Sequence, residues 1–448
     1  MRRPHKRSRW LLLLPVTYLL LLIDWHGPRR PPEPRLLRAF EASGVLKAGA
    51  ARVRLAPPLP VMRPAFRYPW VTADREQDPL EVRAIVLRSR GRTVALVLAD
   101  LMVVTEDLSR ALESQLRDLH LDGILFVATH THSSVSGFDA HLAAQVLGLG
   151  RFRPDVVKAI IDRSQEAVRA AERALVRVHA RTTETRMPGW AWNRSTPGGA
   201  VDDALTVLLL DTEAGERIAT LAIVAAHPTL FPSVLPELSA DYPGVAMRLL
   251  EKSGGVALLL QGAEGDAAAP GSGWLAIQAA GSFVAKRVSE AAKDATFAED
   301  RMGFTEVEVG LPPADVQKIP YFFLRRPVSN IVGNMLPRSA RVGLVTIGDL
   351  ALLTVAGEPT ALAARQMIAD LPAGALSGRK VRVTALAQGY VSYIETPERV
   401  REGLGESRRA WYGPDLLGDV DRGFIVAVRA NRGLGEEGEH PTMKIAVR

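Results

Sequence analysis

The 448-residue sequence contains no cysteine. This absence excludes a disulfide framework, a thiolate metal site and a lipid-modified cysteine, so any metal ion must be held by histidine and oxygen ligands. It does not exclude export, because a chain with 47% hydrophobic residues can form a large core without disulfides. No internal repeat is present, and no GxGxxG or Walker sequence occurs at a predicted strand-to-helix junction, so nucleotide binding has no support.

Most of the chain also lacks an excess of positive charge, although its formal net charge is +7. Residues 1–38 contain nine Lys/Arg and two Asp/Glu, and this difference of +7 leaves residues 39–448 formally neutral. A neutral body does not provide the electrostatic footprint that phosphate binding requires. We therefore expect no nucleic-acid partner.

Residues 1–27 resemble an export signal, since basic residues precede an apolar run over 10–23. No small-x-small cleavage site follows, and Trp10, Tyr18 and Trp25 suit a membrane interface. We predict an uncleaved signal-anchor that crosses the membrane and leaves the remaining chain outside the cytoplasm, in the periplasm or the extracellular space. A cleaved signal peptide with secretion is the second alternative, and a buried core helix is the third. Residues 28–45, rich in Pro and Arg, are predicted to be a tether.

Residues 46–448 alternate between short apolar segments and segments with helical spacing, which predicts a single large α/β domain with mixed sheets flanked by helices. Strands are predicted at 93–99, 124–128, 205–210, 218–225 and 256–260, and a hairpin at 341–347 and 350–355. Helices are predicted at 105–120, 155–178 and 359–371.

The most informative segment is Thr129-His130-Thr131-His132-Ser133, which follows the apolar run 124–128. Side chains alternate along a strand, so we expect His130 and His132 to project from one face at its C-terminal end. Open α/β sheets place ligands and catalytic groups at that end. Two imidazoles there indicate a metal ligand beside a proton-transfer or hydrogen-bonding partner. The alternative is a pair of surface histidines at a strand-to-loop junction.

Four more polar side chains follow or lie near apolar segments: His227, Asp266, Glu358 and Tyr393. Each has a purely structural alternative, such as a capped strand end for His227, a first-turn helix acid for Glu358 and a core position for Tyr393. As a group, two histidines, a glutamate and a tyrosine oxygen are ligands that suit Zn²⁺ without thiolates.

These motifs make the chain similar to the catalytic domain of the neutral (non-lysosomal) ceramidases and their bacterial relatives, from about residue 46 to near residue 414. The matching motifs are, in order, Thr129-His130-Thr131-His132-Ser133, Asn193-Arg194-Ser195, Ala226-His227-Pro228-Thr229, Gly265-Asp266, Gly357-Glu358-Pro359, and Tyr393 followed by Tyr412-Gly413-Pro414.

The resemblance implies a single zinc ion, with ligands His130, His227, Glu358 and Tyr393. Tyr390 is the alternative to Tyr393, which alone keeps the register to the downstream Tyr-Gly-Pro motif. The resemblance also implies that His132 lies beside the metal or faces the scissile carbonyl. It implies that Arg194 holds the substrate or the developing oxyanion.

The sequence departs from the family pattern in several places. The family serine nucleophile lies in Gly-Asp-Val-Ser-Pro, whereas this chain has Gly265-Asp266-Ala267-Ala268-Ala269-Pro270. A further family tyrosine falls at about Gly405, and the glycine-rich loop after the histidine pair is altered at residues 133–138. We expect the catalytic domain without the C-terminal β-sandwich of longer ceramidases.

We therefore predict a zinc-dependent hydrolase that cleaves an amide bond in an N-acylated, ceramide-like lipid with zinc-activated water in place of the serine. His132 or Asp266 is expected to transfer the proton to the leaving amine. The alternatives are an inactive ceramidase-like binding protein and a metallohydrolase of another ester or of a cell-wall amide. Residues 319–326 and 331–336 are predicted to form an apolar loop region, either a lid facing lipid or a loop packed on the core. The oligomeric state does not follow from the sequence.

Overall fold

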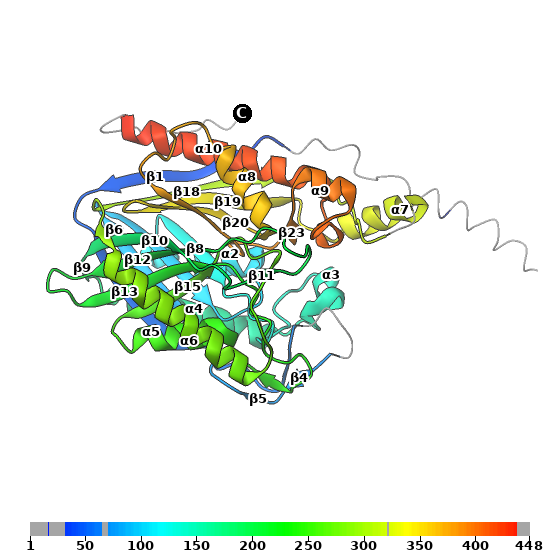
Figure 1. Ribbon diagram of the computed structural model, residues 1–448, viewed down its shortest axis with the longest axis horizontal. Coiled ribbons are helices and arrows are strands. Elements are labelled where there is room, and N and C mark those ends of the chain that lie inside the picture. The colour runs from blue at the N-terminus through cyan, green and yellow to red at the C-terminus, as the bar shows by residue number, and fades with distance from the viewer. Residues whose placement is uncertain (1–16, 18–31, 65–69, 320–321, 437–448) are drawn as a thin grey trace, which may run out of the picture.

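The structure is a computed structural model that describes residue 17 and residues 32–64, 70–319 and 322–436, and most of it is built on three five-stranded sheets (Figure 1). The first sheet has the order β8 (Gly123–Ala128), β7 (Arg92–Ala99), β6 (Glu81–Ser89), β2 (Lys47–Arg54) and β9 (Val176–Arg177). The second has the order β15 (Val256–Gln261), β13 (Arg217–Val224), β12 (Ala204–Asp211), β10 (His179–Arg186) and β17 (Thr296–Phe297). The third has the order β1 (Arg35–Ser43), β18 (Arg301–Gly310), β19 (Ser339–Ile347), β20 (Leu350–Val355) and β22 (Lys380–Thr384).

Helices cover the outer faces of these sheets. Helices α2 (Glu106–Gln115) and α4 (Pro154–Arg173) cover the first sheet, α5 (Asp241–Glu251) and α6 (Trp274–Ala291) the second, and α8 (Ala361–Ala369) and α10 (Leu416–Glu436) the third. The inner faces share one apolar core, which contains Leu96, Leu221 and Leu352 from the three sheets. Burial on both faces explains why the central strands are nearly continuous apolar runs.

In the described parts of the chain, four short two-stranded sheets complete the strands, and three further α-helices lie in the connections. The sheets pair β3 (Val61–Met62) with β4 (Thr72–Ala73), β5 (Arg75–Glu76) with β14 (Glu237–Leu238), β11 (Trp192–Asn193) with β16 (Ala267–Ala268), and β21 (Glu358–Pro359) with β23 (Tyr393–Ile394). The helices are α3 (Leu142–Ala144), α7 (Phe322–Gly333) and α9 (Pro397–Glu402).

Parallel strand pairs bring distant parts of the chain to one place. Strand β7 is parallel to β8, β13 to β15, and β20 to β22. The short pair β21 and β23 is also parallel and sets Glu358 opposite Tyr393. Isolated bridges from Val127 to Ala387 and from His227 to Ala268 connect the segments that follow these strands. The polar residues that follow β8, β13, β15 and β20 can therefore meet at one site, as the carboxyl ends of strands do in open α/β sheets.

The α/β class and every predicted strand are confirmed, with small shifts at the strand ends. The predicted helix over 155–178 is too long at its C-terminus, because α4 ends at Arg173 and Val176–Arg177 form the edge strand β9. The helix predicted over 359–371 starts later than expected. Thr360 caps α8 by accepting a hydrogen bond from the backbone N–H of Ala363, and Glu358 lies in β21 instead of a first helical turn.

The predicted tether over residues 28–45 is wrong in its second part, because Arg35–Ser43 form β1, antiparallel to β18. Phe40 and Ala42 are buried, so this edge strand belongs to the folded domain. Among the parts of the chain that the structure describes, no helix has the length and apolar character needed to cross a membrane. The predicted signal-anchor over residues 1–27 lies, except for residue 17, outside those parts.

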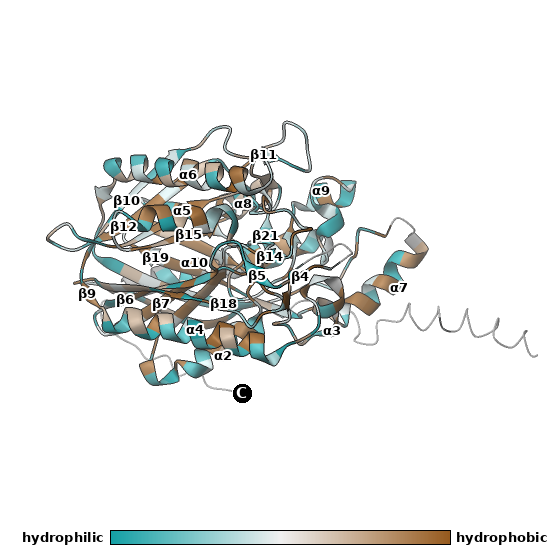
Figure 2. Cartoon of the chain, turned by 90° about the horizontal axis from the view of Figure 1, so that it is seen from below, coloured by the Kyte–Doolittle hydropathy of each residue, from teal (hydrophilic) through white to brown (hydrophobic). Residues whose placement is uncertain are grey.

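The apolar region over 319–326 and 331–336 is not the loop that we predicted. Residues Phe322–Gly333 form helix α7, which stands at the same end of the molecule as α3 in both views (Figures 1 and 2). The helical spacing was hidden in the sequence by Pro327, which lies inside α7.

Candidate metal centre

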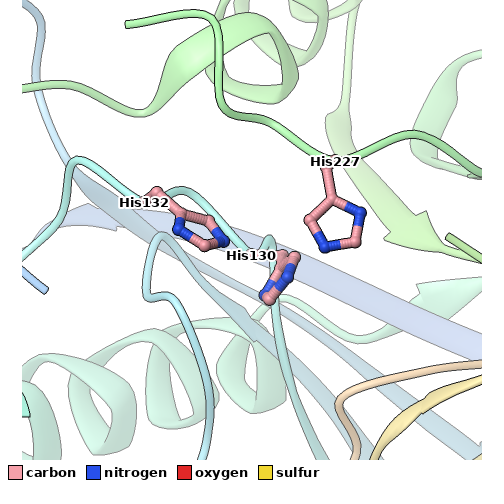
Figure 3. A group of neighbouring side chains, drawn as sticks. All are labelled: His130, His132 and His227. Atoms are coloured by element: carbon pink, nitrogen blue, oxygen red, sulfur yellow. The ribbon is translucent and has the colours of Figure 1, made fainter. Parts of the chain in front are cut away.

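His130 lies in the loop after β8 and not on the strand, which ends at Ala128. Its backbone adopts the left-handed conformation with φ of 70°, and its N–H donates to the carbonyl oxygen of Leu101 at 2.9 Å. The strand-alternation argument for the histidine pair is therefore wrong, because both residues follow the strand. Their proximity is nevertheless confirmed, since the ring centroids of His130 and His132 lie 4.9 Å apart (Figure 3). The Nδ1 atom of His130 lies 2.7 Å from the carbonyl oxygen of Met102, which orients the ring and leaves Nε2 toward the cluster.

His227 follows β13, and it is fully buried. Its Nδ1 atom lies 2.8 Å from the carbonyl oxygen of Glu264 and 3.1 Å from that of Ala267. Its Nε2 atom lies 2.9 Å from Oε2 of Glu358 and 3.1 Å from the hydroxyl oxygen of Tyr393. Burial, followed by the positive charge of Arg194, lowers the pKa of His227 to about 4. The imidazole is thus neutral at pH 7, which is the form that binds metal ions.

Glu358 lies between the two imidazoles. Its Oε2 atom is 2.9 Å from Nε2 of His227 and 3.3 Å from Nε2 of His130, while its Oε1 atom accepts a hydrogen bond of 2.6 Å from the Tyr390 hydroxyl. Burial by itself raises the pKa of Glu358, but the neighbouring His130 and His227 outweigh burial and hold this pKa well below its usual value. The side chain is therefore an ionised carboxylate.

Both tyrosines that the sequence offered as ligands reach this cluster. Tyr393 places its hydroxyl oxygen beside His227, and Tyr390 contacts the other oxygen of Glu358. Because the Tyr393 hydroxyl lies on the side where the His227 and Glu358 donor atoms meet, the geometry favours Tyr393 as the fourth ligand and Tyr390 as the residue that orients Glu358.

These donor atoms have the spacing that a zinc ion requires. A tetrahedral ion with bonds of 2.0–2.1 Å separates its ligand atoms by about 3.3 Å. The separations found here are 3.3 Å for His130 and Glu358, 2.9 Å for His227 and Glu358, and 3.1 Å for His227 and Tyr393. The ring nitrogens of His130, His132 and His227 also lie within 4.8 Å of one another (Figure 3). The residues present therefore fit a single divalent cation.

Glu264 is a residue of this cluster that the sequence reasoning missed. It is fully buried, and neither of its carboxylate oxygens has a hydrogen-bond partner in the described part of the chain. A carboxylate oxygen of Glu264 lies within 4.8 Å of the donor atoms of His130 and Glu358. Burial, and then repulsion from Glu358, raises the pKa of Glu264 well above its usual value. An acid shortly after a buried strand was the available sequence signal, and a nearby cation is what would offset its burial.

Arg194 closes the other side of the cluster. Its Nε donates to Glu406 at 3.0 Å, and its Nη2 donates to the carbonyl oxygen of Gly265 and to the Tyr393 hydroxyl, both at 2.9 Å. Burial opposes the charge of Arg194, but Tyr393 and Glu406 outweigh burial and raise its pKa. The guanidinium is therefore a fixed positive charge within hydrogen-bonding distance of a predicted ligand. Glu406, which also accepts hydrogen bonds from Ser195 and Arg409, was not identified from the sequence.

Asp266 and His132 occupy different environments. Asp266 accepts hydrogen bonds from the Asn193 side chain at 2.7 Å and from the backbone N–H of Ala361 at 2.9 Å. The two carboxylate oxygens of Asp266 thus hold the loop of Arg194 and the start of α8. Burial raises the pKa of Asp266 to about 6. The His132 ring lies beside the predicted ligands, with its centroid 6.0 Å from that of His227. Burial lowers the pKa of His132 well below its usual value, so the imidazole is neutral.

Ala267, Ala268 and Ala269 are buried in the segment that follows Asp266. Ala267 and Ala268 form β16, which pairs with β11 so that Ala268 lies opposite Trp192. The carbonyl oxygen of Ala267 faces Nδ1 of His227. This segment therefore supports a predicted ligand through its backbone.

Comparison with known proteins finds one family model and solved structures that are similar to this chain. Residues 79–294 match the family model described as neutral/alkaline non-lysosomal ceramidase, N-terminal. A solved structure of a ceramidase complexed with C2 aligns with a TM-score of 0.77 and 18% identity, over 90% of this chain and 78% of that chain. The crystal structure of neutral ceramidase from Pseudomonas aeruginosa aligns with a TM-score of 0.74 and 20% identity, over 87% of this chain and 75% of that chain.

No curated protein matches the sequence. The two solved structures are too different in sequence to show more than a shared fold, whereas the family model matches the sequence itself. The matched range contains His130, His132, Arg194, His227, Glu264 and Asp266. Residues 79–294 of this chain are therefore similar in sequence to the N-terminal domain of the neutral/alkaline non-lysosomal ceramidases.

Proposed function

We propose that the protein is a zinc-dependent hydrolase that cleaves an amide bond in an N-acylated, ceramide-like lipid. The observation that carries this proposal is the convergence of the donor atoms of His130, His227, Glu358 and Tyr393, from distant parts of the chain, with separations suited to one zinc ion. The family match supplies the class of substrate.

His130, His227, Glu358 and Tyr393 would hold the ion. When bound there, Zn²⁺ supplies Lewis acidity, which lowers the pKa of a coordinated water molecule and polarises the amide carbonyl. The carboxylates of Glu358 and Glu264 bring negative charge into a buried site, where a divalent cation lowers the cost of that charge. Arg194 donates to the Tyr393 hydroxyl and so stabilises the phenolate form that binds a metal.

His132 is the residue to which we assign proton transfer. A neutral imidazole accepts a proton from the attacking water as the oxygen–carbon bond forms, and the same ring then donates this proton to the leaving nitrogen as the carbon–nitrogen bond breaks. Asp266 is less suited to this role, because both of its oxygens already accept hydrogen bonds from Asn193 and Ala361. We therefore assign Asp266 to positioning.

A ceramidase-like protein that binds a lipid without cleaving it is the second candidate. The observation that favours it is the presence of the buried Ala267, Ala268 and Ala269, which have no hydroxyl, where the resemblance places the serine nucleophile. Zinc content without hydrolysis of any N-acyl lipid would support this candidate and exclude ours. Hydrolysis of an ester or a cell-wall amide instead would keep the metal chemistry and change the substrate class.

The His227→Ala variant tests the proposed site. We expect the full-length wild-type protein to retain about one zinc ion and to hydrolyse at least one member of a panel of N-acyl sphingoid and N-acyl amino-acid lipids. The variant should lose both the metal, measured by plasma mass spectrometry, and the turnover. His179→Ala is the matched control, because His179 lies in β10, where its ring pairs with Asp300 and not with the cluster. A His227→Ala variant that keeps both zinc and turnover would refute the assignment.

The cellular location is also part of the proposal. The basic, then apolar pattern of residues 1–27 supports a membrane anchor with the catalytic domain outside the cytoplasm, with secretion after cleavage as the second choice. Protease protection of the domain in cells whose outer envelope has been permeabilised, lost only when the cytoplasmic membrane is lysed, would contradict this location.

A further inference from the structure

Helix α7 exposes apolar side chains on the face that points away from the protein. Leu324 and Ile331 are seven residues apart, so they lie on one face of the helix, and Met335 continues this face in the following turn. Each of these three side chains is about 40% exposed. Figure 2 shows hydrophobic residues along α7, which lies at the edge of the molecule.

The side of α7 that contacts the domain carries polar side chains together with Val332, which packs against the core of the third sheet. Arg325 pairs with Asp315 through two contacts of 2.6 Å. The buried Ser329 lies one turn further along the helix, and its hydroxyl accepts a hydrogen bond from the backbone N–H of Val316 at 2.9 Å. A surface helix of a soluble protein usually turns its large apolar side chains toward the core, whereas Leu324 and Ile331 of α7 are exposed. The orientation of α7 therefore indicates an apolar partner outside the protein.

A second element with exposed apolar side chains lies at the same end of the molecule as α7. Leu142 of α3 and Val146 of the π-helical turn Gln145–Leu149 are 64% and 61% exposed. We refer to Leu142, Val146, Leu324, Ile331 and Met335 as the apolar rim. In both views, α3 and α7 lie at the same end of the molecule (Figures 1 and 2).

The apolar rim borders a cavity whose wall includes two residues that contact predicted metal ligands. The cavity has a volume of about 630 Å³, and Leu142 and Met335 lie in its wall. Its wall also contains Tyr390, whose hydroxyl donates to Glu358, and Met102, whose carbonyl oxygen faces His130. The volume lies in the range that holds a small molecule or part of a lipid.

The charges around α7 are positive. They favour a negatively charged lipid surface as the partner over a protein groove that is itself positively charged. Residues 316–338 contain Lys318, Arg325, Arg326 and Arg338 and no Asp or Glu. Arg326 and Arg338 are at the surface. Of the three acids in the cavity wall, Glu106 pairs with Arg110 and Asp139 with His141, while the exposed Asp107 lies 3.8 Å from Nδ1 of His141. Basic residues beside an exposed apolar helical face are typical of helices that lie in a membrane interface.

We propose that the apolar rim inserts into the interface of a lipid bilayer, so that the cavity mouth faces the membrane. The bilayer is the partner, with anionic headgroups beside Arg326 and Arg338. The identity of the substrate in the cavity rests on the proposed function, but the evidence for membrane contact does not, because it comes from exposure, orientation and charge.

The absence of cysteine allows a direct test. The full-length Ile331→Cys variant, labelled with the fluorophore NBD, is mixed with vesicles of phosphatidylcholine, with and without phosphatidylglycerol. We expect a blue shift and a severalfold rise in emission, larger with phosphatidylglycerol. The matched control is Val176→Cys in β9, which is similarly exposed (42%, against 40% for Ile331) and lies at the opposite end of the molecule (Figures 1 and 2). Its emission should not change, and any anchoring by residues 1–27 is common to both variants.

Two results would overturn the proposal. One is an unchanged Ile331 probe, or equal changes in both probes, in the presence of vesicles. The other is an Ile331 signal that rises with protein concentration without lipid, which would show that a second copy of the chain covers the apolar rim. Membrane contact without hydrolysis of N-acyl lipids would contradict the proposed function alone.

Discussion

The Glu264→Gln substitution tests whether this buried carboxylate is held near a cation. Wild-type Glu264 has no hydrogen-bond partner for either carboxylate oxygen in the described part of the chain, and its pKa is raised by burial and by the charge of Glu358. Glutamine has nearly the same shape but cannot ionise. The substitution therefore removes the penalty on ionisation and leaves the packing nearly unchanged.

The magnitude follows from proton linkage. In the unfolded chain this carboxyl titrates near 4.5. Above that pH the unfolded state releases a proton that the metal-free folded state retains, so the unfolding free energy falls by about 1.4 kcal/mol per pH unit until the folded pKa is reached. At pH 7 this loss is at most about 3.4 kcal/mol. Below the unfolded pKa the loss vanishes, because the carboxyl is protonated in both states.

The assay is urea unfolding of the metal-free protein at a series of pH values from about 4 to 7, at constant ionic strength. The difference in unfolding free energy between Glu264→Gln and wild type should grow in favour of the variant as the pH rises. A buried amide that lacks a partner costs about 1–3 kcal/mol, but this cost shifts the difference by a constant and leaves its slope unchanged. The exposed Glu398 provides the control, because Glu398→Gln makes the same chemical change at the surface.

Bound zinc should make the wild type more stable than the Glu264→Gln variant, because the ion stabilises the ionised carboxylate of the wild type. We expect Glu264→Gln to bind zinc more weakly by calorimetric titration. A stability difference that does not depend on pH would refute the reasoning about Glu264, even if zinc affinity were reduced.

Two further substitutions probe the support of the site. Arg194→Lys should keep the zinc content but lower kcat for N-acyl hydrolysis by about 10²–10³. Lysine keeps the positive charge but lacks the planar guanidinium that contacts both Tyr393 and Glu406. An unchanged kcat would remove Arg194 from the mechanism. Gly265→Ala should weaken zinc binding and lower stability by about 1–3 kcal/mol, because the new Cβ would lie 2.6 Å from the backbone oxygen of Glu358 and displace this ligand. Gly418→Ala is the control for calorimetry and thermal unfolding, because nothing lies within 4 Å of its new methyl group and alanine is favoured over glycine in a helix such as α10. Equal zinc affinity in the two glycine variants would contradict the proposed role of Gly265.

The fold class and most strands could be predicted from the sequence because burial on both faces demands continuous apolar runs, and such runs are visible locally. Helix α4 was predicted to continue past Arg173 because its apolar periodicity continues into the edge strand β9. β1 was missed because its edge position buries only a few side chains, and the Pro- and Arg-rich residues before it concealed a short alternating pattern.

The candidate metal centre was also only partly predictable from the sequence. The motifs identified His130, His227, Glu358 and Tyr393 as candidates, and the structure brings all four together. The reason first offered for the histidine pair was wrong, because the chain turns at His130 through a left-handed conformation that no strand pattern predicts. Glu264 was overlooked because a glutamate in a glycine-containing segment has no local sign of burial, and the neighbours that surround it come from other strands.

The sequence by itself determined the residue types available for metal binding and the apolar segments that form the three sheets. Only the tertiary structure decided which oxygen meets which nitrogen, because His227 and Glu358 are separated by 131 positions and meet through the pairing of β21 with β23 and the bridge at Ala268. It also decided that α7 turns its apolar face outward. Contact and orientation depend on the register of strands far apart in the chain, and local patterns of hydrophobicity do not contain that register.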